Sequence, residues 1–406
     1  MKKIMILGCG VYQIPLIEYA IKHYSVILVA PDIPDEIKKK VAHFYLIDLR
    51  EQEEILKYAQ KEKIDGIITD QTDIPVRTVA YVAEKMGLHG ITYETSCLFS
   101  DKHLMREKLK ELGLQYIPYK TSSNASDAVV FAESIGFPVI IKPVDNQGSR
   151  GVFKIENPAQ LYQQFDAAIS VSLSKQVIVE KYITGREAVV EGLVMNYQYQ
   201  TLICGDTYYF EIKDSFAAKT RIFPSKLSND IQGKITSFNQ QIIKGFGLKQ
   251  GITHSEFLID ENDDVYLIET AARGGGVFIS SDLISLRTGL NTEKFLTDIA
   301  VNGTSNIKLS DTGKVCCYIA FFLPKGEIVS ISGVEEVKRF PFVHRNLLDT
   351  IRIGIKTKKA EDKTSRFSII VSADNFDELD QNIQQIKNVL KVKTVTEHGI
   401  ENPIWE

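Results

Sequence analysis

Two glutamates, Glu256 and Glu269, are the residues whose types and spacing point most clearly to chemistry. They lie in two β-rich runs, ITHSEFLI and VYLIE, joined by the polar stretch DENDD, which is the pattern of a β-hairpin. If residues 261–264 form the loop, the two glutamates pair directly, with Cβ atoms about 5 Å apart on one face. Such like charges repel unless a cation separates them, and a hard cation such as Mg²⁺ suits carboxylate oxygens. The hairpin therefore predicts a metal site. The alternatives are an exposed hairpin whose glutamates keep it soluble, or a one-residue slip that separates them.

A lysine and a glycine-containing loop form the second candidate site. Lys142 ends the apolar run PVIIK, and Gly148, Ser149, Arg150 and Gly151 follow shortly after it. Phosphate binding needs positive charge and closely approaching backbone N–H groups, which glycines permit because they lack Cβ. The pairing predicts a phosphate site. The alternative is a lysine that reaches solvent from a strand end.

The chain has further cationic residues beside these two motifs. Arg273 follows Glu269 by four residues and precedes three glycines, which suits binding of a phosphoryl group, although a surface ion pair explains it too. Lys213, Lys219 and Arg221 lie in EIKDSFAAKTRIFPSKL, where alternating charge is also typical of a solvated loop.

Alternating βα patterns over residues 1–97 predict a parallel sheet with helices on both faces. Its first turn has Gly8 and Gly10, but Gln13 stands where a third glycine of a GxGxxG motif belongs, so the dinucleotide signature is weak even though Asp32 follows. We interpret the turn as lining for a carboxylate-bearing substrate, with a tight structural turn as the alternative.

Later residues predict a mixed middle region and a small α+β region at the end. DKHLMREKLKELGL has helical spacing, and QVIVEKYITGREAVVEGLVMN and YQTLICGDTYYFE alternate like antiparallel strands. Residues 306–406 combine strands with one long helix, whose apolar positions predict a core-facing stripe. These positions are Phe376, Leu379, Ile383, Ile386 and Leu390.

Composition bounds the class of protein. The 406 residues are 44% hydrophobic and 25% charged with a net charge of −4, which is typical of a globular protein of two or three domains. There is no basic block, so small molecules are expected as partners and nucleic acid is not. Five cysteines without CxxC spacing fit a reducing cytoplasm, and the run VCCYIAFFL is about half as long as a membrane span.

Five motifs occur in one order along the chain: SDKHLMREKL, PVIIKPVDNQGSRGV, VIVEKYITGRE, HSEFLID and IETAARGGG. Together they resemble the ATP-grasp superfamily over essentially the whole chain. The resemblance implies a three-domain α/β and α+β architecture. It comprises a doubly wound parallel sheet at residues 1–97 (the pre-ATP-grasp domain), an ATP-grasp domain at 98–305 with a mobile lid at 120–182, and a C-terminal α+β domain at 306–406.

The resemblance also implies roles for named residues. Two lysines contact the ATP phosphates, the loop at 145–152 closes over them, the segment 180–183 binds adenine partly through its backbone, and Glu187 meets the ribose hydroxyls. Glu256 and Glu269 hold Mg²⁺, for which Mn²⁺ is a substitute. The residues so assigned to ATP are Lys102, Lys142, Gly148, Ser149, Gly151, Glu180, Lys181, Tyr182, Ile183 and Glu187.

One position departs from the family pattern, because Ala271 stands where many members have a metal-binding asparagine. The run ETAARGGG is similar to the branch of amino-acid and dipeptide ligases. In that branch Arg273 is expected to stabilise the transferring phosphoryl group, with Lys142 and either Lys219 or Arg221 as further cations at the reaction.

The function that the resemblance implies is an ATP-dependent carboxylate–amine ligase acting through an acyl-phosphate, with an amino acid or dipeptide as substrate. Dimers are common for enzymes built this way. One alternative is a carboxylase or purine-pathway ligase using bicarbonate or formate. Others are a nucleotide-binding regulator with a decayed site, supported only by Ala271, and an NAD-dependent dehydrogenase, which rests on the weak glycine turn.

Overall fold

The first part of the chain folds into a parallel β-sheet with helices on both faces, as predicted. The computed structural model describes residues 1–146, 150–212, 217–358 and 366–406. The sheet has the order β3-β2-β1-β4, and every pairing in it is parallel. Its strands are β1 (Lys3–Leu7), β2 (Ser25–Ala30), β3 (His43–Leu46) and β4 (Gly66–Ile68). Its helices are η1 (Val11–Gln13), α1 (Ile14–His23), α2 (Asp35–Lys38), α3 (Gln52–Glu62), α4 (Val76–Met86) and α5 (Tyr93–Leu98).

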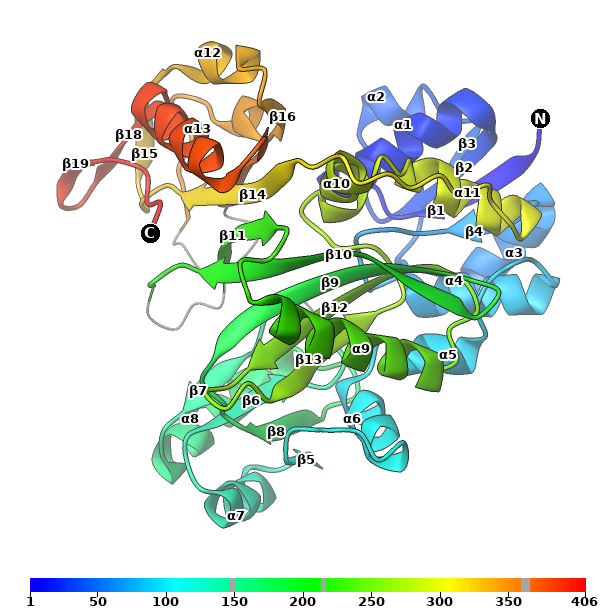
Figure 1. Ribbon diagram of the computed structural model, residues 1–406. Coiled ribbons are helices and arrows are strands. Elements are labelled where there is room, and N and C mark those ends of the chain that lie inside the picture. Colours follow the sequence, from blue (N-terminus) through cyan, green and yellow to red (C-terminus); the bar gives the residue numbers. More distant parts are fainter. Residues whose placement is uncertain (147–149, 213–216, 359–365) are drawn as a thin grey trace.

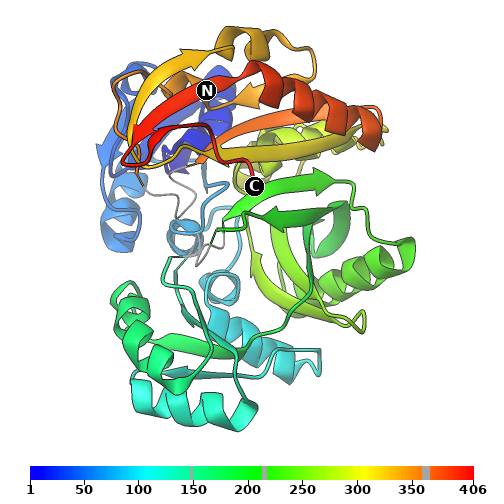
Figure 2. The ribbon, with the colours of Figure 1, turned by 90° about the vertical axis from the view of Figure 1, so that its left-hand side faces the viewer.

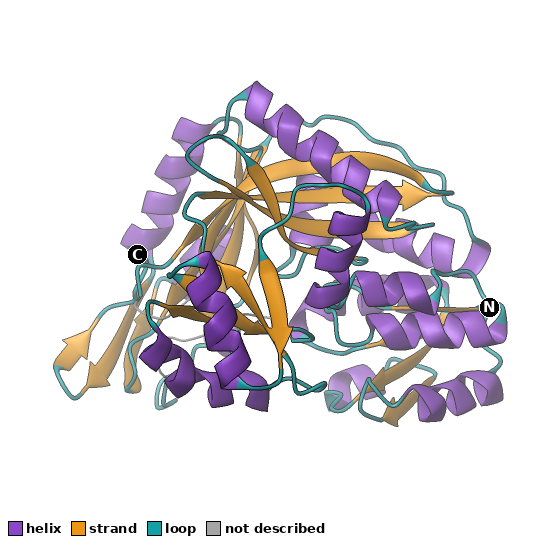
Figure 3. Cartoon of the chain, turned by 90° about the horizontal axis from the view of Figure 1, so that it is seen from below, coloured by secondary structure: helices purple, strands orange, loops and turns teal. Residues whose placement is uncertain are grey.

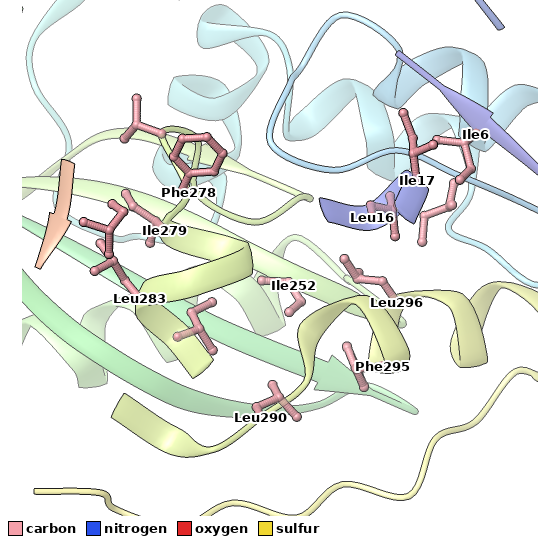
Figure 4. Packing of buried hydrophobic residues seen from close by; sticks show 14 of the residues in the cluster. Ile6, Leu16, Ile17, Ile252, Phe278, Ile279, Leu283, Leu290, Phe295 and Leu296 are labelled. Carbon is pink, nitrogen blue, oxygen red and sulfur yellow. The ribbon is translucent and has the colours of Figure 1, made fainter. Parts of the chain in front are cut away.

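Alternate side chains of β1 pack into two different cores. Ile4 and Ile6 join α1 and the later helix α11 (Thr292–Asn302), whereas Met5 and Leu7 face α3 and α4. Figure 4 shows Ile6, Leu16 and Ile17 on one side of this shared core, opposite Leu296 and Phe295. The parallel sheet is therefore fixed to the following region through α11.

An antiparallel four-stranded unit forms the lower part of the molecule in Figure 1, and it falls within the region predicted as a lid. The strand order is β5-β8-β6-β7. Helix α6 (Lys102–Glu111) leads into it. Its strands are β5 (Tyr119–Ser122), β6 (Val139–Pro143), β7 (Phe153–Ile155) and β8 (Val177–Lys181), and its helices are α7 (Ala125–Ile135) and α8 (Pro158–Ser170). Figure 2 shows this unit at the opposite end of the molecule from the C-terminal strands.

A large antiparallel sheet, of order β13-β12-β9-β10-β11-β14-β17-β16, joins the middle of the chain to its C-terminal part. Because β11 pairs with β14, the sheet continues across the predicted boundary at residues 305 and 306. Its strands are β9 (Arg186–Met195), β10 (Gln198–Tyr209), β11 (Ala218–Phe223), β12 (Gly251–Ile259), β13 (Val265–Ala271), β14 (Val315–Phe322), β16 (Val343–Asn346) and β17 (Arg366–Ala373). Figure 3 shows helices covering these strands on their outer side.

The remaining elements complete the two ends of this sheet. Helix α9 (Asn229–Gly245) packs on the middle strands, and η2 (Ile279–Leu283) and α10 (Ile284–Thr288) follow β13. The C-terminal elements are β15 (Glu327–Ser332), α12 (Val334–Arg339), η3 (Leu348–Thr350), α13 (Phe376–Val389), β18 (Lys391–Thr396) and β19 (Gly399–Glu401). The core-facing stripe predicted for α13 is confirmed, because its apolar residues all belong to one core cluster. In the described part of the chain, no helix is long and apolar enough to cross a membrane.

Candidate active site

The pairing predicted for Glu256 and Glu269 is confirmed, although the hairpin reaches it by a different route. The loop has five residues, 260–264, because the β12–β13 pair nearest the turn joins Ile259 to Val265. That register alone would place Glu256 opposite Ile268. A β-bulge leaves Ile268 without a partner in the ladder and restores the pairing of Glu256 with Glu269.

Each of these two carboxylates has a cation beside it. Lys102, the first residue of α6, places its Nζ 3.3 Å from Oε1 of Glu269 and donates to the Asn146 carbonyl at 2.8 Å. The guanidinium of Arg221 donates to Glu256. Burial raises the pKa of Glu256, but Arg221 and His254 outweigh it and hold the pKa well below its usual range. The site therefore keeps the Glu256 carboxylate ionised.

A buried hydrogen-bond chain connects Glu256 to the glycine-rich loop after β13. Nε2 of His254 lies 3.2 Å from Oε1 of Glu256, and Nδ1 of the same ring contacts Glu191, which is fully buried. The other oxygen of Glu191 accepts from the Gly275 N–H at 2.9 Å. His254 lies two residues before Glu256 on the same face of β12, and its ring is hydrogen-bonded on both sides.

Lys142 and Glu180 form a second charged centre with Arg106. Nε of Arg106 donates to Glu180 at 2.7 Å, and the Lys142 ammonium lies against the other carboxylate oxygen. Burial raises the pKa of Glu180, but the two cations lower it to about 2. Burial also lowers the pKa of Lys142, and Glu180 opposes that shift. The Glu180 side chain is thus committed to these two cations, and its backbone lies in β8 between β5 and β6.

Most of the residues predicted to bind ATP line one cavity of about 180 Å³ between the antiparallel unit and the large sheet. Seven of them are brought together there with the two predicted metal ligands, Glu256 and Glu269: Lys102, Lys142, Glu180, Lys181, Tyr182, Ile183 and Glu187. Apolar walls complete it, from Ile117, Ile140, Val152, Leu258 and Ile268. Such a cavity, with an apolar part and clustered polar groups at one end, suits a nucleotide.

Within this cavity Glu187 has an unusual environment. The Tyr209 hydroxyl donates to its carboxylate. The pKa of Glu187 is raised to about 7. Burial and nearby Glu256 raise it, while Tyr209 and Arg221 oppose the shift. In the segment 180–183, the N–H of Lys181 donates to the Pro118 carbonyl at 3.1 Å and the N–H of Tyr182 donates to the Pro138 carbonyl at 3.2 Å. These bonds fix the backbone of the segment against the residues that precede β5 and β6.

A second cleft, of about 320 Å³, adjoins the first and shares Asn146 and Glu269 with it. Its other walls come from the parallel-sheet region and from the antiparallel unit. They include Arg50, Asp73, Arg77, Tyr93 and Asp145. A small substrate in this cleft would lie next to the carboxylate of Glu269.

Several predicted residues lie away from the cavity lining. Lys219 is paired with Glu406, the last residue of the chain. Arg273 forms a two-pronged ion pair with Asp73, through Nε at 2.7 Å and Nη2 at 2.8 Å. Gly151 is in the left-handed region with φ of +75° and packs against Pro143. The predicted residues Gly148, Ser149 and Lys213 lie outside the described residues.

The glycine turn after β1 is occupied by its own chain. Oε1 of Gln13 accepts from the Gly10 N–H at 2.9 Å, and Nε2 of Gln13 donates to the Asp70 carbonyl at 3.1 Å. In a dinucleotide-binding turn these backbone donors face a pyrophosphate. The glutamine side chain fills that role here, which supports the interpretation as a structural turn.

Sequence reasoning missed a polar segment after β4, TDQTD, which binds the glycine-rich loop. Asp70 accepts from the Gly274 N–H at 2.9 Å, and Gln71 accepts from the Phe278 N–H at 2.9 Å. Asp73 binds Arg273. The signal that could have revealed them is their position at the carboxyl end of a parallel strand, where ligands and loops gather in open α/β sheets.

The donor set fits a divalent cation held by two carboxylates. Among the described residues, no group of three or more His, Cys, Asp and Glu side chains is placed to hold a metal ion. Ala271 is 2% exposed and lies opposite His254. An apolar methyl group therefore stands where the resemblance expects a metal-binding asparagine.

Comparison with known families gives the same assignment as the geometry. Residues 135–282, which include Lys142, Glu187, Glu256 and Glu269, match the ATP-grasp domain family. The chain therefore contains an ATP-grasp domain, and its overall fold is that of the solved structures described next. Among the solved structures with this fold, one was determined with MgADP and another with ADP.

Solved ATP-grasp structures match nearly the whole chain. L-amino acid ligase from Bacillus licheniformis is 20% identical with a TM-score of 0.80, over 97% of this chain and 98% of that one. Phosphoribosylglycinamide synthetase from Anaerococcus prevotii is 18% identical with a TM-score of 0.75, over 96% and 99%. The biotin carboxylase domain of 2-oxoglutarate carboxylase from Hydrogenobacter thermophilus, solved as a dimer with MgADP, ADP and bicarbonate, is 18% identical with a TM-score of 0.77, over 99% and 91%. These likenesses establish the three-part ATP-grasp fold and leave the substrate open.

Proposed function

We propose that this ATP-grasp protein joins the carboxylate of one amino acid to the amine of another through an acyl-phosphate. The observation that carries the proposal is the convergence of Lys102, Lys142, Glu256 and Glu269 on one cavity, with a second cleft opening at Glu269. The likeness to an L-amino acid ligase over almost the full length supports the choice of amino acids.

In the first step, a carboxylate oxygen of the donor attacks the γ-phosphorus of ATP, the bond to the β-phosphate oxygen breaks, and ADP leaves. Lys102 lies beside Glu269, where its charge offsets that developing on the phosphates. Lys142 is held by Glu180 in the same cavity, where its ammonium is a second cation for the phosphates. Positioning by these cations supplies most of the catalysis expected for phosphoryl transfer.

In the second step, the amine attacks the acyl carbon, inorganic phosphate leaves, and the ammonium that forms loses its proton. A free carboxylate is a poor electrophile, so the phosphoryl group serves as the leaving group. Because an acyl-phosphate hydrolyses readily, the antiparallel unit at 120–182 must exclude water during turnover. Closure of this unit remains a prediction from the family.

Glu256 and Glu269 are the residues that would hold Mg²⁺, with Mn²⁺ as a substitute. When bound, the ion neutralises phosphate charge. Arg221 and Lys102 lie beside the same two carboxylates in the structure, where a bound cation would meet them. Ala271 leaves no third protein ligand on β13.

The experiment is ADP release from Mg²⁺-ATP with amino acids supplied singly and in pairs. Release that requires two amino acids is the expected result and would name both substrates. Bicarbonate and formate form separate arms, since the solved neighbours include a biotin carboxylase domain and a ribotide-pathway synthetase. Release that depends on bicarbonate alone would overturn the amino-acid assignment.

A further inference from the structure

A row of polar side chains crosses the large sheet from the nucleotide cavity toward the C-terminal strands. Cross-strand pairing places Glu187 opposite Thr207, Thr207 opposite Arg221, and Arg221 opposite Tyr318. Directly paired residues share one face of the sheet. Tyr318 therefore lies on the same face as the nucleotide-binding groups, one strand beyond Arg221.

Polar atoms around Tyr318 are buried without partners. Tyr318 is fully buried and Ser368 is 1% exposed, and neither hydroxyl makes a hydrogen bond with the described residues. Nε of Arg366 is also buried and unpaired, although its Nη1 donates to the Ala218 carbonyl. Buried polar groups in native proteins are nearly always satisfied, so a group of three unpaired atoms on neighbouring strands indicates a missing ligand.

These atoms lie close together. The Arg366 guanidinium carbon is 5.9 Å from the centre of the Tyr318 ring. Tyr12, from the turn after β1, packs edge-on against Phe278 and lies close enough to the same two residues to sense their charge: burial raises the pKa of Tyr12, Tyr318 also raises it, and Arg366 lowers it. Groups from the first and last thirds of the chain thus meet beside the large sheet.

The charge of this cluster fits a carboxylate. Arg221 is already paired with Glu256, and within the described part of the chain no acidic side chain forms an ion pair with Arg366, so among these residues the guanidinium of Arg366 is available to an anion. A single guanidinium with nearby hydroxyl donors suits the planar monoanion of a carboxylate. The phosphates are accounted for by Lys102 and Lys142 in the nucleotide cavity.

The position of the cluster indicates which carboxylate it binds. Tyr318 lies four strand spacings from Glu256, about 19 Å between backbones before the side chains reach toward each other. The reacting carboxylate must lie beside Glu256 and Glu269, so a group bound at Tyr318 is the far end of a substrate. In a ligase that joins two amino acids, the carboxylate that stays free belongs to the amine-side amino acid.

We propose that Arg366, Tyr318 and Tyr12 bind the α-carboxylate of the amine-side amino acid, with Ser368 beside them. This inference rests on the proposed ligase function and adds a specificity subsite to it. The subsite selects free amino acids over amines that lack a carboxylate, and it points the amine toward the acyl-phosphate.

The test compares binding of the twenty amino acids with binding of their carboxamides, measured by calorimetry with Mg²⁺ and a non-hydrolysable ATP analogue. Wild type should prefer free acids by about tenfold or more, as expected for hydrogen bonds to a charged group. Arg366→Gln should lose that preference. Arg352→Gln, which removes an exposed arginine of the same region, should retain it.

Tyr318→Phe separates a binding role from a structural one. Its hydroxyl has no partner in the structure, so its removal should leave the melting temperature unchanged or raised while weakening binding of the free acids several-fold. Equal binding of acids and carboxamides by wild type, no binding of either, or an unchanged preference in Arg366→Gln would each overturn the subsite. Wild type that binds acids selectively but never releases ADP would instead count against the ligase function alone.

Discussion

Arg106 on α6 and Ile268 on β13 are joined by a hydrogen bond of 2.7 Å, from Nη2 of the arginine to the backbone carbonyl of the isoleucine. Ile268 is the residue that bulges out of the β12–β13 ladder and so brings Glu256 opposite Glu269. The same guanidinium binds Glu180, the partner of Lys142. One buried arginine therefore supports both the carboxylate pair and, through Glu180, the position of Lys142.

Replacing Arg106 should be costly. Arg106→Met leaves Glu180 buried with only Lys142, and breaking a buried ion pair in this way costs about 3–5 kcal/mol. Urea unfolding should show that loss in the free energy of unfolding. Lys108→Met, on the same helix and paired with the exposed Glu111, should cost under about 1 kcal/mol. Equal losses in the two variants would contradict the role given to Arg106.

Two adjacent glycines provide a matched test of the loop after β13. A Cβ on Gly275 would lie 2.5 Å from Oε1 of Glu191 and 3.0 Å from Nδ1 of His254, whereas one on Gly276 would meet nothing closer than 3.6 Å. Gly275→Ala should displace the Glu191–His254 chain and reduce ADP release about tenfold or more, with about 1–3 kcal/mol lost in stability. Gly276→Ala should stay within about twofold of wild type in ADP release. The reverse order of effects would show that this chain does not support the site.

Glu187 should give a pH-dependent difference in stability. Its pKa is raised to about 7 in the folded protein, above the usual value of a glutamate, so between these two values the folded state keeps a proton that the unfolded state has lost. The free energy of unfolding therefore falls as pH rises through that window. Glu187→Gln cannot titrate, so its stability relative to wild type should increase between about pH 5 and pH 8, by roughly 1–3 kcal/mol. Asp70 and Glu293, whose pKa values are also raised, are present in both proteins and cancel in the difference. A constant difference across this range would contradict the assignment.

Variants of the Arg273–Asp73 ion pair distinguish two roles for the arginine. If Arg273 fixes the glycine-rich loop to the parallel-sheet region, Arg273→Met and Asp73→Asn should reduce ADP release similarly. The double variant should then lose no more than either single variant, with a coupling energy of about 0.5–3 kcal/mol. Full activity in Asp73→Asn combined with loss in Arg273→Met would instead favour direct contact of Arg273 with the phosphoryl group.

Local patterns in the sequence were sufficient to predict the elements, whereas most of the cavity residues were assigned through the resemblance to the ATP-grasp superfamily. The β-rich runs around Glu256 and Glu269 and the apolar run before Lys142 predicted strands that the structure contains. The five-residue loop and the compensating bulge at Ile268 were not predictable, since the bulge is supported by Arg106, 162 residues away in the chain. Asp70 and Gln71 were missed for the same reason, because a polar run after a short strand is indistinguishable from an ordinary turn until its partners at Gly274 and Phe278 are known.

The measurement that tests the central claim most directly is ADP release from Mg²⁺-ATP with paired amino acids, in wild type and in Glu269→Gln. Glu261→Gln, in the exposed hairpin loop, serves as the control for loss of a glutamate from the same hairpin. We expect wild type and Glu261→Gln to release ADP at similar rates, and Glu269→Gln to lose at least about a hundredfold while its melting temperature is retained. Full ADP release by Glu269→Gln would contradict the assignment of Glu256 and Glu269 as the metal-binding pair of an ATP-dependent ligase.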